Sequence, residues 1–130
     1  MQQGLRTDEL RTIRFQIKDG VTFSRDGLGV AIDDNGQAAL PGGDADLFTI
    51  GVTADAGTGV GDDDNPQFVD VYINPPSVKA IAGAAIVAGK TCVTKGTAGK
   101  WMNGTTAGAV VLRALTPAAA DGDEFYATGA

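Results

Sequence analysis

The sequence contains no histidine, one cysteine and few aromatic side chains, and each shortage excludes a class of site. Histidine is the commonest general base and transition-metal ligand, so its absence excludes Ser-His-Asp and Cys-His catalysis. Cys92 is the only cysteine, so the chain has neither an internal disulfide nor a cysteine-rich metal site. Aromatic residues make up 6 % and glycines number 19, which predicts a core of small side chains approached closely by turns. We expect no catalytic residue, no cofactor and no bound metal.

Long apolar runs and an excess of basic residues are also missing. No run approaches the roughly 20 apolar residues of a membrane-spanning helix, and residues 1–12 lack the apolar core of an export signal. The 16 acidic and 10 basic residues give a net charge of −6, which opposes binding to nucleic-acid phosphates. The 130 residues suffice for one domain. We therefore expect a protein of a soluble compartment, with no membrane partner and no direct nucleic-acid partner.

The charge is unevenly distributed along the chain. Residues 1–25 hold five basic and three acidic side chains, net +2, whereas residues 26–130 hold five basic and thirteen acidic ones, net −8. A basic leading segment on an acidic body predicts an arm that docks on an acidic partner surface, and a frayed polar terminus is the alternative. We assign residues 1–12 to an N-terminal arm and residues 13–130 to a single β domain. The candidate docking residues are Arg6, Arg11 and Arg14.

Short strands dominate the remainder of the chain. Apolar Ile13, Phe15 and Ile17 alternate with polar residues, the period of a half-buried strand. Asp-Gly or Asn-Gly pairs at residues 19–20, 26–27 and 35–36 predict tight turns of hairpins or a meander. With no long amphipathic helix, eight to ten short strands predict an all-β fold, either a small β-barrel, a β-tulip-like domain or a sandwich. Strands are expected within residues 12–18, 21–24, 28–33, 37–40, 47–54, 68–74, 78–82, 91–95, 109–116 and 124–128.

Trp101 lies in a stretch that the sequence predicts to be a turn-rich connection, residues 96–108. A large aromatic residue between glycines serves either as a core residue or as an anchor in a subunit interface. Both interpretations stay open at this point, and Trp101 is the candidate subunit-interface residue.

The octapeptide AAIVAGKT, residues 84–91, loosely fits the loop that binds nucleotide phosphates. Such a loop needs a helix starting at its Lys-Thr pair, but the next residues, CVTKGTAGKW, are poor helix formers with two glycines. Alternating strands and helices are also missing. We therefore expect a turn between two strands, with Ile81, Ile86 and Val87 packed inward and Lys90 exposed.

Acidic residues gather in three places. Asp62, Asp63 and Asp64 offer hard oxygen ligands for Ca²⁺, but their spacing is not that of a calcium loop, so a solvated loop is the favoured interpretation. The pairs at residues 33–34 and 44–46 have the chemistry of glycosidase carboxylates, but no aromatic sugar platforms lie nearby in the sequence.

Two segments of the chain show a weak internal similarity. Residues 49–64, TIGVTADAGTGVGDDD, and residues 111–124, VLRALTPAAADGDE, each run from a strand through a loop of small residues to acidic residues. An internal duplication is one explanation, and the Ala/Gly bias of the chain is the other.

The second part of the chain repeats a pattern of short apolar strands, small-residue turns and an Ala-rich loop. The pattern begins with the strand and loop IGVTADAGTGV and continues through residues 83–89, 91–95, 97–100, 110–115, 117–121 and 124–128. In these segments residues 47–130 resemble the capsid decoration (cement) proteins of tailed bacteriophages. The chain departs from that family at Leu112, where a glycine often precedes the arginine, and at the acidic loop of residues 62–64.

This resemblance implies a β-barrel or β-tulip-like fold and a structural role in the virion. The protein would bind the outer surface of the phage head as a homotrimer and clamp neighbouring subunits of the major capsid protein. A carbohydrate- or host-surface-binding β module is the alternative, based on Trp101, Tyr72 and Tyr126 near acidic loops.

Overall fold

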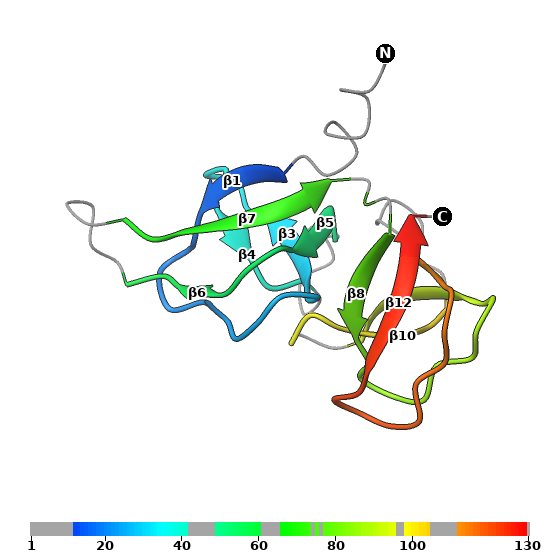
Figure 1. The fold of residues 1–130 in the computed structure, drawn as a ribbon. Coiled ribbons are helices and arrows are strands. Elements are labelled where there is room, and N and C mark those ends of the chain that lie inside the picture. Colours follow the sequence, from blue (N-terminus) through cyan, green and yellow to red (C-terminus); the bar gives the residue numbers. More distant parts are fainter. Residues whose placement is uncertain are drawn as a thin grey trace, which may run out of the picture.

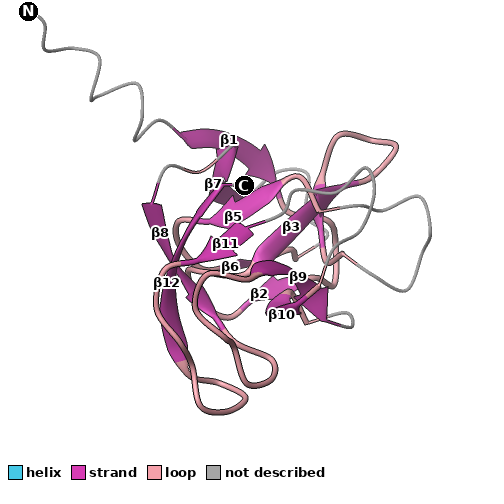
Figure 2. Ribbon diagram, turned by 90° about the vertical axis from the view of Figure 1, so that its right-hand side faces the viewer, coloured by secondary structure: helices cyan, strands magenta, loops and turns pink. Residues whose placement is uncertain are grey.

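The fold consists of short β-strands and turns (Figures 1 and 2). The computed structural model describes residues 12–41, 49–60, 66–73, 75, 77–95, 98–104 and 112–129. Within these ranges no helix occurs. The strands are β1 (Thr12–Gln16), β2 (Thr22–Phe23), β3 (Gly29–Ile32), β4 (Ala38–Ala39), β5 (Gly51–Thr53), β6 (Gly57–Thr58), β7 (Phe68–Ile73), β8 (Ser77–Ile81), β9 (Thr91–Lys95), β10 (Lys100–Asn103), β11 (Leu112–Ala114) and β12 (Glu124–Gly129).

The strands form two five-stranded antiparallel sheets and a small two-stranded one. The first sheet has the order β1-β7-β5-β3-β4, and β2 pairs with β6 beside it. The second has the order β10-β9-β11-β12-β8. Figure 1 shows the two sheets side by side, each built from one continuous part of the chain. We call residues 12–73 the first unit and residues 77–129 the second unit.

Both units have the same topology. When the five sheet strands of each unit are numbered in chain order, the strands lie across each sheet in the order first, fifth, fourth, second, third. In each unit a parallel bridge links the residue after the first strand to the third strand, Ile17 to Ala38 and Ala82 to Trp101. In each unit the loops after the first and fourth strands also meet in an antiparallel pair, β2 with β6 and Ile86 with Ala118.

Turn geometry follows the same repeat. The amide of Gly27 donates to the Thr53 carbonyl (2.9 Å), and the amide of Gly89 donates to the Ala114 carbonyl (2.7 Å). Both glycines have positive φ, 85° and 83°. The topology supports the internal duplication suggested by the similarity between residues 49–64 and 111–124. The strands β5 and β11 lie in these two segments and occupy equivalent places in the two sheets.

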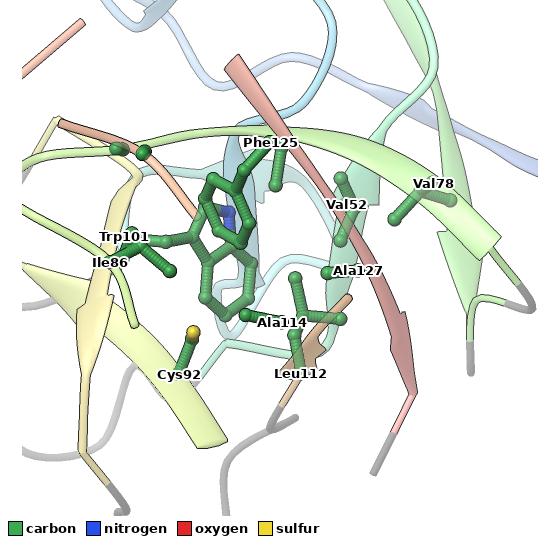
Figure 3. Packing of buried hydrophobic residues seen from close by; sticks show 12 residues of the cluster. Val52, Val78, Ile86, Cys92, Trp101, Leu112, Ala114, Phe125 and Ala127 are labelled. Carbon is green, nitrogen blue, oxygen red and sulfur yellow. The ribbon is translucent and has the colours of Figure 1, made fainter. Parts of the chain in front are cut away.

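Each unit has a buried cluster of apolar side chains. Phe23 and Val30 belong to the cluster of the first unit, with Ile17, Ala38, Val69 and Val71. The cluster of the second unit surrounds Trp101 and Phe125, and Val52 of the first unit joins it (Figure 3). Because Val52 is fully buried there, the two units share apolar surface.

The all-β fold class predicted from the sequence is confirmed, and of its alternatives the closed barrel is excluded. The protein is all-β and sandwich-like, because one isolated bridge, rather than a continuous ladder, links the edge strands of each five-stranded sheet. This excludes a closed barrel. Of the three predicted turns, all contain a positive-φ glycine, but only Asn35-Gly36 connects paired neighbouring strands, β3 and β4.

Two strands were not predicted. β6 lies in a segment expected to be a loop, and β10 lies in the connection expected around Trp101. Glycines on both sides of β10 concealed it: Gly99 makes a turn with φ of 80°, after which Trp101 packs inward while Met102 is exposed. Residues 1–11, with Arg6 and Arg11, lie outside the described residues, and β1 begins at Thr12.

The junction between the units depends on close backbone approach at Gly29. Its amide donates to the Gly99 carbonyl (2.7 Å), and the hydroxyls of Thr49 and Thr94 lie 3.0 Å apart beside it. A Cβ at Gly29 would lie 2.3 Å from Thr94 Cγ2, closer than non-bonded carbon atoms approach. Any residue larger than glycine would therefore require Thr94 to move.

Gly29→Ala is therefore expected to destabilise the protein by about 1–3 kcal/mol, as for an overpacked core. Thr94→Ser removes the clashing methyl and keeps the hydroxyl that faces Thr49. Gly29→Ala/Thr94→Ser should recover part of the loss, and urea unfolding of all four proteins closes the cycle. Strictly additive effects would contradict the clash.

Candidate interaction surfaces

Trp101 is a core residue of the second unit. Its side chain is 0 % exposed, and its Nε1 donates a hydrogen bond to the Gly27 carbonyl (3.1 Å). Figure 3 shows the indole beside Phe125, with Cys92 and Leu112 in the same cluster. The assignment of Trp101 to a subunit interface is therefore corrected: β10 turns the side chain inward, so it presents no surface to a neighbouring subunit. It holds the two units of one chain together.

Four charged side chains surround the same junction. Arg25 is hydrogen-bonded to Glu124 through Nη2, and Asp26 lies 3.8 Å from Arg25 Nε. Lys79 Nζ lies 3.7 Å from carboxylate oxygens of both Asp26 and Glu124. The hydrogen bond from Arg25 lowers the pKa of Glu124 below its usual value, and the positive charge of Lys79 adds to the effect. These pairs are half-exposed, so they orient the units more than they stabilise them.

Arg14 is the one candidate docking residue within the described part of the chain. It lies on edge strand β1, where its side chain is 68 % exposed and Nε donates to Asp70 Oδ1 on β7 (3.1 Å). This hydrogen bond raises the pKa of Arg14. The Asp70 amide in turn donates to Asp55 Oδ1 (3.0 Å). The guanidinium is thus accessible but already paired.

The octapeptide AAIVAGKT forms a turn between β8 and β9, as predicted. Ile86 is buried and paired with Ala118, Lys90 is exposed, and Thr91 begins a strand instead of the helix that a phosphate loop requires. Gly89 has the positive φ expected of a turn glycine.

The predicted inward packing of Val87 is wrong. Its side chain is 55 % exposed, although Ile81 and Ile86 are buried as expected. The turn directs Val87 outward because its amide is held by Asn103 Oδ1 (2.9 Å) while the buried place is filled by Ile86. A valine between Ile86 and Ala88 carries no sequence signal for the direction of its side chain.

Of the acidic residues considered from the sequence, Asp33 has a structural role and Asp34 is exposed. Asp33 Oδ1 accepts from the amides of Asn35 and Gln37, both at 2.9 Å, and so closes the β3-β4 turn. Residues 62–64 and 44–46 lie outside the described residues. Within the described ranges no three His, Cys, Asp or Glu side chains gather as metal ligands.

The three aromatic residues considered for sugar binding, Trp101, Tyr72 and Tyr126, do not form one exposed surface. Tyr126 is 59 % exposed, whereas Tyr72 packs partly buried against the core of the second unit and Trp101 is fully buried. The sugar-stacking set considered from the sequence is therefore not assembled.

Cys92 is buried, and burial raises the pKa of its thiol. In the described segments no helix has the length and apolar character needed to cross a membrane.

The Trp101 contact predicts a large effect of a conservative substitution. Trp101→Phe removes the N–H that reaches Gly27 and leaves space beside Phe125, so the unfolding free energy should fall by about 2–4 kcal/mol. Met102→Leu, on the adjacent and exposed position of β10, is the control and should cost less than about 1 kcal/mol. Urea unfolding followed by circular dichroism compares them, and equal losses would contradict the junction role.

The pKa of Glu124 predicts a pH dependence. A carboxylate with a depressed pKa in the folded state contributes stability above its ordinary pKa, near 4.5, and this contribution is lost as pH falls through the folded value. Glu124→Gln should therefore lose less stability than wild type between about pH 5 and pH 3. Asp34→Asn, an exposed carboxylate in the β3-β4 turn, controls for the change in net charge. Parallel acid transitions in wild type and Glu124→Gln would refute the coupling.

The chain was also compared with known proteins. No protein-family profile, no curated protein and no solved structure matches it. The function must therefore be inferred from the residues and their geometry.

Proposed function

We propose that this protein is a capsid decoration protein of a tailed bacteriophage. In this proposal it binds the outer surface of the assembled head as a homotrimer and stabilises contacts between subunits of the major capsid protein. The resemblance of residues 47–130 to the decoration family supports the proposal, and the all-β fold agrees with it. The protein acts through binding alone, as a structural component of the virion.

The separation of charge along the chain is the observation that carries the proposal. Residues 1–25 have a net charge of +2 on a body of −8, so the leading segment is the part suited to an acidic shell. Within this segment Arg14 and Lys18 are exposed, whereas Arg25 is engaged at the unit junction. The docking residues are Arg6, Arg11 and Arg14.

Binding of this kind stabilises a shell by mass action. A ligand that binds the assembled shell and not its dissociated subunits raises shell stability by RT ln(1 + [L]/Kd), about 2.7 kcal/mol per site at a hundredfold excess over Kd. Because a head offers many equivalent sites, a modest interface at each one suffices. In this proposal the tight junction between the two units makes the chain a rigid link between neighbouring subunits of the major capsid protein.

Virion composition tests the proposal directly. Mass spectrometry of purified phage particles from the host that carries this sequence should find the chain in stoichiometric amounts relative to the major capsid protein. Its complete absence from virions would overturn the assignment.

The role of the leading segment has its own test. Arg6→Gln/Arg11→Gln should weaken binding to shells that lack the protein by about tenfold or more, since about 1 kcal/mol is expected for each charge-assisted contact. Lys95→Gln/Lys100→Gln removes two charges from the body and should bind like wild type. Co-sedimentation with shells measures both, and equal losses would contradict docking through the leading segment.

A further inference from the structure

The contact between the two units of the chain is of the head-to-tail kind. The first unit contributes a turn, Arg25 to Gly29, and the second contributes the edge of β8 with the start of β12. The Gly27 carbonyl accepts from the Ile81 amide (3.2 Å), and Arg25 pairs with Glu124. Two repeated units that touch through different surfaces form a heterologous contact, which leaves one copy of each surface unused.

Strand register identifies the unused surfaces. Ile13 pairs with Val71 as Val78 pairs with Ala127, so β1 corresponds to β8 and β7 to β12. The ladder bonds agree, because the Ile17 amide donates to the Gln67 carbonyl as the Ala82 amide does to that of Asp123, both at 2.8 Å. On this register the counterparts of Ile81 and Glu124 are Gln16 and Phe68.

The counterpart of the docking turn is the turn of AAIVAGKT. Gly27 corresponds to Gly89 by hydrogen bond and by φ. Counting back from these glycines, Arg25 corresponds to Val87. The ion pair of Arg25 with Glu124 therefore has Val87 and Phe68 as its counterparts.

Both counterparts are exposed apolar side chains. Val87 is 55 % exposed and Phe68 is 44 % exposed, and they lie in different units. Val87 and Phe68 therefore match in chemistry, although each of them taken alone is a single apolar side chain exposed to solvent. Asp26 and Lys79 correspond to Ala88 and Arg14, so this contact has no counterpart of the Asp26–Lys79 ion pair, and Arg14 is paired with Asp70 of its own unit. The Val87–Phe68 pair is apolar where the equivalent pair within the chain is ionic.

The backbone groups are also complementary. Because the Ile17 amide makes the ladder bond, alternation along β1 directs the Gln16 amide to the open edge of the sheet, as the Ile81 amide is directed toward Gly27. The Gly89 carbonyl lies in an exposed turn and accepts a hydrogen bond from Arg113 Nη1 (2.9 Å). A carbonyl has a second lone pair, and Gly27 uses both of its own, toward Ile81 and Trp101.

We propose that a second copy of this chain docks on β1 and β7 through its Val87–Lys90 turn, with Val87 against Phe68, repeating between chains the contact that joins the units. Successive copies then associate head to tail, and the contact closes into a ring if its rotation allows. The number of copies, three, rests on the proposed function; in such a ring six units would surround the axis. The contact itself does not require a shell.

Charge substitution tests the contact in the free, full-length protein. Val87→Arg or Phe68→Glu places an unpaired charge in the interface and should weaken self-association about tenfold or more. Val87→Arg/Phe68→Glu reproduces the Arg25–Glu124 pair and should restore most of the association. Sedimentation velocity over a range of concentrations measures the mass relative to one chain of 13.2 kDa.

Leu115→Arg is the matched control. Leu115 is 51 % exposed, and its counterpart Ala54 bonds to Asp70 within its own unit, so this charge should leave association unchanged. All three positions are exposed, and circular dichroism verifies the fold of each of the four variants. A wild-type protein that stays monomeric at every concentration, or single variants that associate like wild type, would overturn the contact.

The experiment separates this contact from the proposed function. If substitutions at Val87 and Phe68 weaken self-association but the protein is absent from virions, the contact is retained and the function is rejected. If the protein is present in virions but these substitutions leave self-association unchanged, the function is retained and the contact is rejected.

Discussion

The hydrogen bond from the Trp101 indole to the Gly27 carbonyl is the interaction on which the arrangement of the two units depends. It joins the only tryptophan, in the core of the second unit, to a turn of the first. A buried indole N–H needs an acceptor, and the Gly27 carbonyl is held in place because its residue has a positive φ and a Cβ there would lie 2.8 Å from the Lys79 carbonyl. Position, partner and backbone conformation therefore specify one another.

The repeated topology explains how two similar units acquired different cores. At equivalent places the first unit has Phe23 and Ala38, and the second has Ile86 and Trp101. In the first unit the larger of the two side chains is Phe23, on β2, whereas in the second unit it is Trp101, on β10. Interiors of constant packing density permit such exchanges only if the volumes compensate. Only the second arrangement brings an indole N–H within reach of the other unit.

The surfaces differ for the same reason. Where the units meet, the pair is Arg25 with Glu124, and at the equivalent free places it is Val87 with Phe68. A permanent contact within one chain tolerates a half-exposed ion pair because the covalent linkage supplies the proximity. A contact between separate copies must offset the entropy of association, for which apolar burial is better suited. This distinction agrees with a chain proposed to assemble in multiple copies on a shell.

The sequence by itself determined the all-β class, most of the strands and the turns at Gly20, Gly27 and Gly36, because alternation and turn glycines are local signals. It also determined that AAIVAGKT is a turn, since the residues after it cannot sustain a helix. Only the tertiary structure decided that Trp101 is buried, that Val87 is exposed and that the units repeat one topology. Those features depend on pairings between residues far apart in the chain, and an Ala- and Gly-rich sequence carries little side-chain information about which strands pair.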